Sequence, residues 1–339
     1  YSAVVSLTLL MVVASAFGAL AGEQSRSDWP DQVVIGAPSL GSSYYICNAG
    51  LAQLIEKKLD IRSNVEVTGG VDPGTRMMMR GDININAGAN VTVNDAYRGK
   101  GRFEKVGKQP LRMICNAYAL NLATWVRAKS NIKTFKDLKG KRWMADKPGS
   151  SVVKVYRDTM LKYHDLKLSD FKMQPIKGVK AACNNLRDRF TDAFTWPTSF
   201  GPAAEMVELS NTRPLSIIAL DEHEMEALMK ASRSFYPSYV KGGLFKGIDK
   251  DMPTVGIGIV FYVMADLPND FVYALLDVIY GETNEEFTSM HPTAQSMTLD
   301  HALDTVPIPL HEGAIEYYKD RGIWNDQLAK EQASLSQNR

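Results

Sequence analysis

The chain contains few of the residues that most often carry metal binding, redox chemistry or disulfide cross-links. Its 339 residues include three cysteines and five histidines. No two cysteines have the C-x-x-C spacing of a zinc or dithiol site, and three are too few for a disulfide scaffold. The histidines form no H-E-x-x-H pattern. The sequence therefore argues against a metalloenzyme and a disulfide-rich fold, but leaves open whether any two of the cysteines pair (Cys47, Cys115 and Cys183).

An excess of charge of either sign is also missing. The chain has 39 Lys and Arg against 38 Asp and Glu, so its formal net charge is +1. Nucleic-acid binders usually carry a clear basic excess, so we expect no nucleic-acid partner. Charged residues make up 23% and hydrophobic residues 45% of the chain, which is ordinary for a globular protein. The length is typical of two domains of roughly 100–200 residues each.

The sequence motifs of nucleotide and acyl-transfer enzymes are absent as well. The chain has no G-x-x-x-x-G-K-[ST] loop, no G-x-G-x-x-G after a strand and no G-x-S-x-G elbow. The histidines are scattered, and no pair lies at i, i+4 on an evident helix. We therefore predict that the protein is not an enzyme and needs no cofactor.

One long uncharged run is present, at the start of the chain. Residues 3–21 contain no charged side chain and end in Ala19-Leu20-Ala21, which is an A-x-A pattern. An apolar core followed by small residues is typical of a signal peptide. The alternative is a membrane anchor, because the run is nearly long enough to span a bilayer. We expect residues 1–21 to be a signal peptide cleaved near Ala21, and the mature protein to be exported.

Short β-type runs alternate with helical periodicity from Val33 onward, which indicates an α/β fold with mostly parallel strand pairing. The run 83–87 alternates at period two, as a half-exposed strand does. A Gly/Pro-rich region at 236–243 is expected to precede the last strand. The predicted helices lie at 43–59, from 151 onward, at 268–280 and at 314–320. The predicted strands are 33–37, 65–67, 83–87, 111–115, 122–127, 143–145, 171–176, 192–196, 215–219 and 255–264.

Two of the predicted helices begin with the same kind of turn. Gly41-Ser42-Ser43-Tyr44 follows the first strand, and Gly149-Ser150-Ser151 follows the first strand of a second α/β unit. Glycine lets backbone approach a ligand, hydroxyls can donate, and a helix N-terminus carries partial positive charge. Two such turns facing one another would hold a small anion without a metal. The alternative is that Ser43 and Ser151 are ordinary helix caps.

Several ordered motifs resemble the solute-binding proteins of the TAXI branch of the TRAP transporter family. The resemblance covers almost the whole mature length and includes Gly41-Ser42-Ser43-Tyr44-Tyr45, Pro148-Gly149-Ser150-Ser151 and Pro309-Leu310-His311-Glu312-Gly313-Ala314. It implies a class II periplasmic binding protein, which is an α/β fold of two lobes joined by a hinge with a ligand cleft between them. We expect lobe 1 to comprise residues 28–124 and 255–339, and lobe 2 residues 125–254. His311 lies in the C-terminal helical part, and we interpret it as structural.

The resemblance also implies a function. Such a protein captures a small carboxylate in the periplasm, such as glutamate or a dicarboxylate like 2-oxoglutarate, and delivers it to the membrane subunits of an ion-gradient-driven permease. We expect it to work as a monomer. The alternatives are a sensor that passes its ligand-bound state to a kinase, or a binder of an aromatic or apolar carboxylate. A third is an enzyme on the same fold, as in tetrapyrrole or thiamine-precursor synthesis, which the export signal and the missing motifs disfavour.

The chain departs from the family pattern where the ligand is expected. Gly70-Val71-Asp72-Pro73-Gly74 lacks the usual Ser and Asn, and Ala89-Asn90 replaces a Q-S pair. The segment 195–202 contains Trp196, which can stack on an apolar or aromatic part of a ligand. An arginine such as Arg76 or Arg127 can pair a carboxylate bidentately. The candidate ligand-binding residues are Ser42, Ser43, Tyr44, Arg76, Asn90, Gly149, Ser150, Ser151 and Trp196.

Overall fold

The computed structural model describes residues 26–337, apart from Ser39, Gly41, 147–149, 200–201 and Arg233. The predicted signal peptide and Gly149 lie outside the described residues. The chain divides into two compact units, Tyr1–Pro30 and Asp31–Arg339. In the first unit the structure describes a turn of 3-10 helix, η1 (Arg26–Asp28). The following paragraphs describe the second unit.

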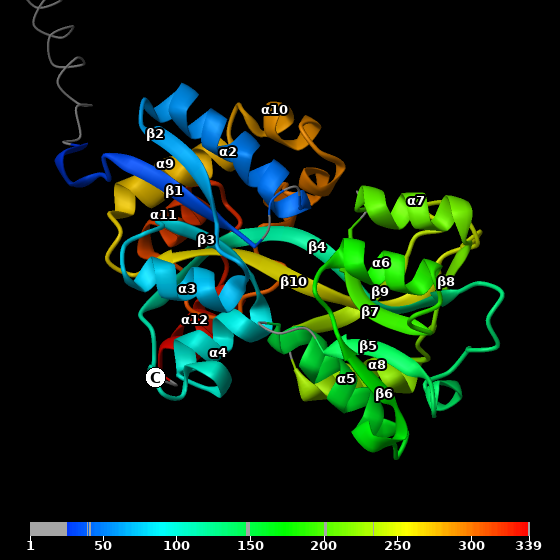
Figure 1. Ribbon diagram of the computed structural model, residues 1–339. Coiled ribbons are helices and arrows are strands. Elements are labelled where there is room, and N and C mark those ends of the chain that lie inside the picture. The colour runs from blue at the N-terminus through cyan, green and yellow to red at the C-terminus, as the bar shows by residue number, and fades with distance from the viewer. Residues whose placement is uncertain are drawn as a thin grey trace, which may run out of the picture. The chain divides into compact units, whose positions relative to one another are not determined.

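One ten-stranded sheet runs through the described part of the second unit (Figure 1). The strand order is β2-β1-β3-β10-β4-β7-β5-β6, with β8 paired to β4 and β9 paired to β10. The strands are β1 (Gln32–Ala37), β2 (Arg62–Val67), β3 (Ile85–Ala89), β4 (Leu111–Arg127), β5 (Arg142–Asp146), β6 (Lys172–Pro175), β7 (Ala193–Thr198), β8 (Leu215–Ile217), β9 (Phe235–Val240) and β10 (Met252–Met264).

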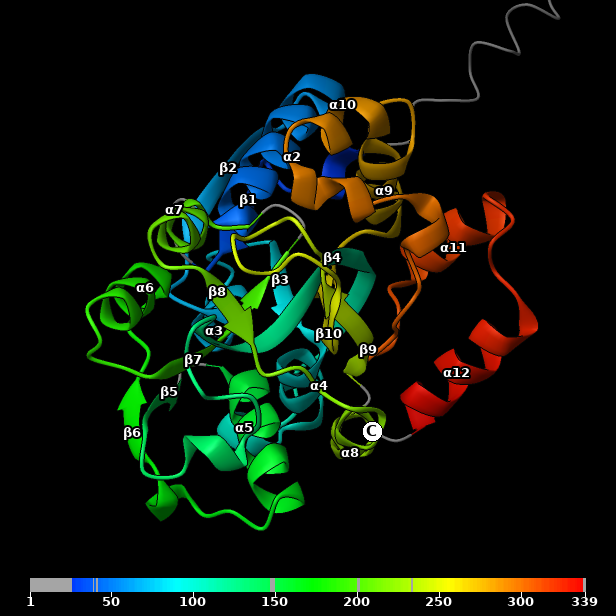
Figure 2. The same ribbon diagram turned by 90° about the vertical axis from the view of Figure 1, so that its right-hand side faces the viewer.

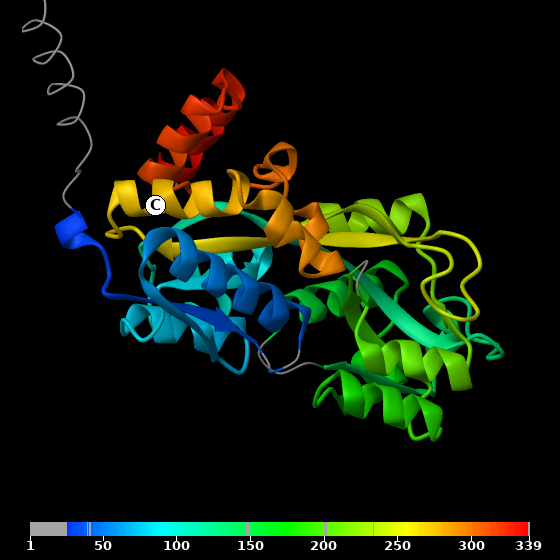
Figure 3. The ribbon, with the colours of Figure 1, turned by 90° about the horizontal axis from the view of Figure 1, so that it is seen from above.

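The pairing is mixed, so the prediction of mostly parallel strands was wrong. β1 runs parallel to β2 and β3, and β5 runs parallel to β6 and β7. The long strands β4 and β10 pair antiparallel with each other. β4 is also antiparallel to β7 and β8, and β10 to β3 and β9. The two long strands therefore join two parallel groups into one sheet, and Figure 3 shows β10 as the long yellow strand between them.

Strand β4 is one continuous element of 17 residues, although the sequence predicted two strands at 111–115 and 122–127. The segment between the two predicted strands includes Asn116 and Asn121. Both amides have partners in the structure. Asn121 Oδ1 accepts a hydrogen bond from Ser238 Oγ at 2.6 Å, and Asn116 Oδ1 accepts one from Thr305 Oγ1 at 2.7 Å. Because these partners come from distant segments, no local pattern predicts the continuity of the strand.

Two further corrections concern β3 and β9. All five residues of β3 are buried, because the strand is central in the sheet and α3 and α4 pack against it; the half-exposed strand predicted there was wrong. No strand was predicted in the Gly/Pro-rich region at 236–243, yet its first half belongs to β9. Pro237 is tolerated there because β9 pairs with β10 on one side.

Helices flank both parallel groups of strands. The described helices of the second unit are α2 (Ser43–Leu59), α3 (Val71–Met79), α4 (Asn90–Arg98), α5 (Ser151–Tyr163), α6 (Val179–Arg187), α7 (Ala204–Thr212), α8 (Glu222–Ala231), α9 (Asn269–Tyr280), α10 (Asn284–Ser289), α11 (Glu312–Asp320) and α12 (Asp326–Gln337). Short 3-10 turns also occur, namely η2 (Gly101–Phe103), η3 (Lys136–Leu138), η4 (Leu168–Asp170), η5 (Pro292–Ser296) and η6 (Leu299–His301). The four predicted helices are confirmed at α2, α5, α9 and α11.

The helices form a layer on each side of the strands. α2 packs on β1, β2 and α9, whereas α3 and α4 pack on β3; in Figures 1 and 2 the first set lies above the strands and the second below. In the other group, α5 packs on β5 and α8, and α6 packs on β7 and α7. A buried core that includes Trp125, Phe194 and Phe245 lies among β4, β7 and their helices. No helix of the described residues combines the length and apolarity needed to cross a membrane.

Candidate functional site

At two strands of the sheet, β1 and β5, the next strands along the chain pair on opposite sides, so the strand order reverses there. From β1 the chain goes to β2 on one side and later to β3 on the other, and β5 has the same relation to β6 and β7. In open α/β sheets, ligands bind beyond the carboxyl ends of the strands at such a reversal. The segments that follow β1, β3, β5 and β7 define a candidate ligand site, here called the strand-end site: Ser42, Ser43, Tyr44, Asn90, Ser150, Ser151 and Ser199.

The segment after β1 forms a capped and firmly packed helix start. Ser42 is the N-cap of α2, and its Oγ accepts a hydrogen bond from the backbone N–H of Tyr45 at 3.2 Å. Ser43 is therefore the first residue of the helix rather than its cap. The ring of Tyr44 lies edge-on to Tyr118, with 5.2 Å between centroids, and burial raises the pKa of the Tyr44 hydroxyl. This packing keeps Tyr44 protonated and fixes the first turn of α2.

Tyr118 connects this helix start to the strand that precedes it. Its hydroxyl donates to Asn48 Oδ1 at 2.6 Å, and Asn48 Nδ2 donates to the backbone oxygen of Gly36 at 3.0 Å. Asn48 is fully buried on α2, and Gly36 lies in β1. The chain of bonds holds the carboxyl end of β1 and the N-terminus of α2 in a fixed relation.

The segment after β5 has a different cap. Ser150 is the N-cap residue of α5, but its side chain makes no capping hydrogen bond, and Ser151 is the first residue of the helix. The hydroxyl of Ser150 therefore does not serve the role that Ser42 serves on α2. Both hydroxyls belong to half-buried residues at a helix N-terminus, where the macrodipole favours a negative group.

The segment after β3 brings the two groups of strands together. Asn90 begins α4, and α4 packs against α5, as Figures 1 and 2 both show. The side chain of Asn90 is buried, and its Nδ2 donates to Thr305 Oγ1 at 2.8 Å. Its Oδ1 is buried and has no hydrogen-bond partner. Helix α4 is thus a contact between the two groups of strands.

Sequence reasoning missed the residue after β7. Ser199 is buried, and its Oγ is 2.9 Å from Thr293 Oγ1 in η5, so the two hydroxyls share a hydrogen bond. The available signal was positional, because Ser199 follows a predicted strand just as Ser42 and Ser150 do. The predicted strand was two residues too short at its end, which hid the equivalence.

Two of the predicted residues lie against other elements. The guanidinium of Arg76 lies 5.3 Å from the ring centroid of Phe103 in η2, and its Nη2 donates to the backbone oxygen of Arg102 at 3.2 Å. Trp196 lies in β7, half-buried against the core that includes Trp125. The backbone oxygen of Trp196 accepts a bond from the indole nitrogen of Trp125 at 2.9 Å. The other arginine considered from the sequence, Arg127, forms an ion pair within the protein, with 3.6 Å between its Nη2 and Asp192 Oδ1.

A comparison with protein families matches the NMT1-like family to residues 35–322, which is most of the chain. The chain belongs to the NMT1-like family. Within this member of the family, the match covers every segment of the strand-end site.

Solved structures share the fold of this NMT1-like protein. XAC2383 from Xanthomonas citri, solved bound to ATP, is 10% identical, with a TM-score of 0.50, covering 89% of this chain and 99% of its own. A protein from Bordetella bronchiseptica RB50 is 17% identical, with a TM-score of 0.50, covering 89% and 92%. The aliphatic sulphonate binding protein SsuA from Escherichia coli is 14% identical over 87% and 94%, with a TM-score of 0.46. The predicted two-lobe α/β fold is confirmed by the two structures with a TM-score of 0.50.

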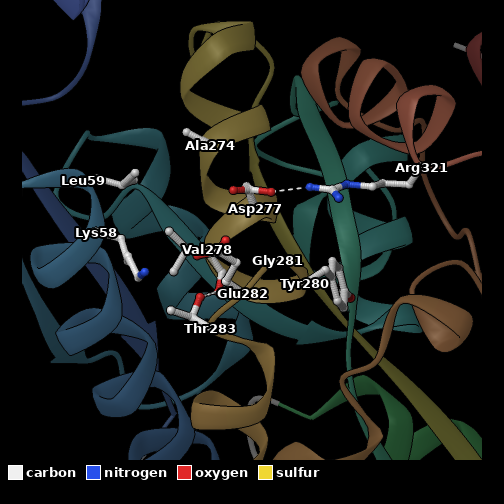
Figure 4. Close-up of a pocket in the computed structure, with 10 residues that line it drawn as sticks. All are labelled: Lys58, Leu59, Ala274, Asp277, Val278, Tyr280, Gly281, Glu282, Thr283 and Arg321. Carbon is white, nitrogen blue, oxygen red and sulfur yellow. Dashed lines mark hydrogen bonds and ion pairs between the residues drawn. The ribbon is translucent and has the colours of Figure 1, made fainter.

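Two surface pockets of this NMT1-like protein lie away from the strand-end site. The pocket in Figure 4 measures about 470 Å³ and lies between the end of α2 and α9, where Asp277 and Arg321 form an ion pair. A second groove of about 590 Å³ lies between α5 and α8 and is lined by residues such as Lys154 and Tyr163. Neither pocket is lined by a predicted ligand-binding residue.

The side chains that define the strand-end site are polar and uncharged. The described residues contain no group of three or more His, Cys, Asp or Glu side chains placed to hold a metal ion. The three cysteines are buried and unpaired, and burial raises the pKa of each thiol to about 12. A thiol with such a pKa is protonated near neutral pH and is a poor nucleophile. What the strand ends present instead is hydroxyls, a carboxamide and helix N-termini, which suit a small polar ligand.

Proposed function

We propose that the protein is a solute-binding protein that holds a small organic anion at the strand-end site. The observation that carries the proposal is the pair of chain reversals, at β1/β3 and at β5/β7, whose helices α4 and α5 pack against each other. A ligand there meets helix N-termini from both groups of strands, so its negative charge is stabilised without a metal. The two-lobe fold and the NMT1-like family agree with this role.

The proposed two lobes follow the boundaries expected from the sequence, 28–124 plus 255–339 and 125–254. Both boundaries fall inside the long antiparallel strands β4 and β10. A hinge in two adjacent strands lets the lobes rotate while each keeps its own helices packed. The Ser199–Thr293 hydrogen bond joins residues of different proposed lobes.

The finer proposal is a TAXI-type protein of the periplasm that passes a carboxylate to a TRAP permease. The motifs in 41–45, 148–151 and 309–314 support it. In the third motif, His311 is the N-cap of α11, and its Nδ1 accepts a hydrogen bond from the backbone N–H of Gly313. Uptake of the ligand by cells that carry the gene, lost on deletion of the membrane subunits, would distinguish transport from sensing.

A ligand screen by thermal shift tests the proposal. The protein without residues 1–21 would be melted with acidic amino acids, C4–C6 dicarboxylates, 2-oxoacids and aromatic carboxylates. A ligand at about 1,000 times its Kd adds roughly 4 kcal/mol to the free energy of unfolding, which raises Tm by several degrees. We expect a rise with a small carboxylate, and mass spectrometry of the denatured protein would exclude a co-purified ligand. No shift with any of them, for ligand-free protein, would contradict the proposal.

A further inference from the structure

A chain of three side-chain hydrogen bonds ends at Asn90, and its direction is fixed by a backbone carbonyl. Asn116 Nδ2 donates to the backbone oxygen of His301 at 3.1 Å, which can only accept. Asn116 Oδ1 is therefore the acceptor for the hydroxyl of Thr305 at 2.7 Å. Because the Thr305 proton is used there, Thr305 Oγ1 accepts from Asn90 Nδ2 at 2.8 Å. The carboxamide of Asn90 thus has one possible orientation.

That orientation leaves Asn90 Oδ1 as an acceptor without a donor. Asn90 is 2% exposed, and its Oδ1 is shielded from solvent with no hydrogen-bond partner. A buried polar atom left unpaired is destabilising, so natural proteins normally supply it with a partner. The atom lies at the carboxyl end of β3, at one of the two chain reversals of the sheet.

A neighbouring buried asparagine shows the opposite situation. Asn86 Nδ2 donates to the Tyr262 hydroxyl at 2.6 Å, which in turn lies 2.7 Å from Thr75 Oγ1. Thr75 Oγ1 donates to the backbone oxygen of Val71, and Asn86 Oδ1 accepts from the backbone N–H of Ala87. Every polar atom of this network has a partner within the protein. Asn86 and Asn90 thus differ, because only Asn90 has a carboxamide oxygen without a donor.

The backbone opposite Asn90 is shaped to admit the amide. A Cβ added at Gly258 of β10 would lie 2.5 Å from Asn90 Nδ2 and 2.7 Å from Thr305 Oγ1. Any other residue at this position would displace both side chains. Glycine at position 258 thus leaves room for the hydrogen bonds among Asn90, Thr305 and Asn116, and keeps Asn90 Oδ1 in place.

We propose that Asn90 Oδ1 accepts a hydrogen bond from an ammonium or hydroxyl group of the ligand. This inference rests on the proposed function and narrows it to carboxylates that carry a donor next to the acid, such as amino acids and hydroxy acids. Dicarboxylates and 2-oxoacids without such a donor leave the Asn90 oxygen unpaired when they bind. Discrimination of this kind is strong, because it works through the cost of a buried unpaired group.

Titration calorimetry with matched ligands tests this selectivity. The series glutamate, 2-hydroxyglutarate and glutarate, and the series aspartate, malate and succinate, vary the donor at constant chain length. We expect donor-bearing members to bind about tenfold or more tightly than the member without one. Asn90→Ala should abolish that ratio with little change in the affinity for glutarate or succinate. Thr305→Val, which removes the group that orients the Asn90 amide, should reduce the ratio as well and serves if Asn90→Ala fails to fold.

Asn86→Ala is the matched control, because it removes an equally buried amide from the closed network; it should lower Tm and leave the ratio unchanged. Equal affinity for members with and without a donor would overturn this inference while leaving the proposed function standing. Equal weakening of all ligands by Asn90→Ala would also overturn it. If none of the six bound but another carboxylate of the thermal-shift screen did, the inference would fail and the proposed function would stand. If no carboxylate of that screen bound, both would fail.

Discussion

The imidazole of His311 is buried at the start of α11, where Nδ1 accepts from the backbone N–H of Gly313 at 3.2 Å. Burial lowers the pKa of His311 to about 4. An unprotonated ring is needed for the acceptor role, so the sequence-based interpretation of His311 as structural agrees with its position. The segment 309–314, which resembles the TAXI pattern, thus includes a helix cap, which a pattern of letters alone does not show.

The low pKa of His311 predicts a loss of stability in acid. Between pH 6.5 and 4 the unfolded chain binds a proton at this ring while the folded chain does not, so stability falls as the pH is lowered through this window. Between pH 6.5 and 4, we expect the free energy of unfolding to fall by roughly 2 kcal/mol more in the wild-type protein than in His311→Asn. Urea denaturation at each pH measures this difference. Ser289→Ala, an uncharged substitution at an exposed residue of α10, is the control and should keep the wild-type slope. Identical slopes for wild type and His311→Asn would contradict the assignment.

Elements with a local signal were predictable, and elements that depend on distant partners were not. The apolar spacing of 43–59 predicted α2 to the residue, because its buried face repeats along its own sequence. The first part of helix α3 was missed, since Gly70, Pro73 and Gly74 are typical of a loop. Its first turn is held by the Tyr262 hydroxyl through Thr75, from a strand almost 190 residues away. The alternating pattern at 83–87 placed Asn86 on the solvent side of its strand. Its hydrogen-bond partner is also Tyr262, which the local sequence does not reveal.

Removing the Tyr262 hydroxyl should therefore destabilise the region where α3 meets the sheet. In Tyr262→Phe, Asn86 Nδ2 is left buried without an acceptor, which costs about 1–3 kcal/mol. Chemical denaturation would measure the difference in the free energy of unfolding. Tyr163→Phe, at a residue 43% exposed, is the control, with an expected change within about 0.5 kcal/mol. A Tyr262→Phe protein as stable as the wild type would show that the network does not anchor α3.

On the scale of the whole molecule, the α/β fold of two lobes was predicted correctly, but the sheet pairing was not. Alternation of β and α elements indicates parallel pairs, and four pairs at β1 and β5 are parallel. The antiparallel strands β4 and β10 pair across more than 100 residues of sequence, so no local pattern reveals their direction. The strand-end site was predictable in part: Ser42 and Ser150 stand at helix starts, whereas Ser199 and the orientation of Asn90 depend on Thr293 and Thr305.

The central claim is that helix starts from both groups of strands bind one ligand. It is tested most directly by calorimetric titration of the double variant Ser43→Ala/Ser151→Ala with the best carboxylate from the screen. Thr288→Ala/Ser289→Ala on α10 is the control, because these hydroxyls bond to backbone oxygens within their own exposed turn. We predict about tenfold or weaker binding for the first variant, since two hydrogen bonds to a carboxylate are lost, and unchanged binding for the control. Affinity within about a factor of two of the wild type would contradict the account, as that change is below the loss of even one such bond.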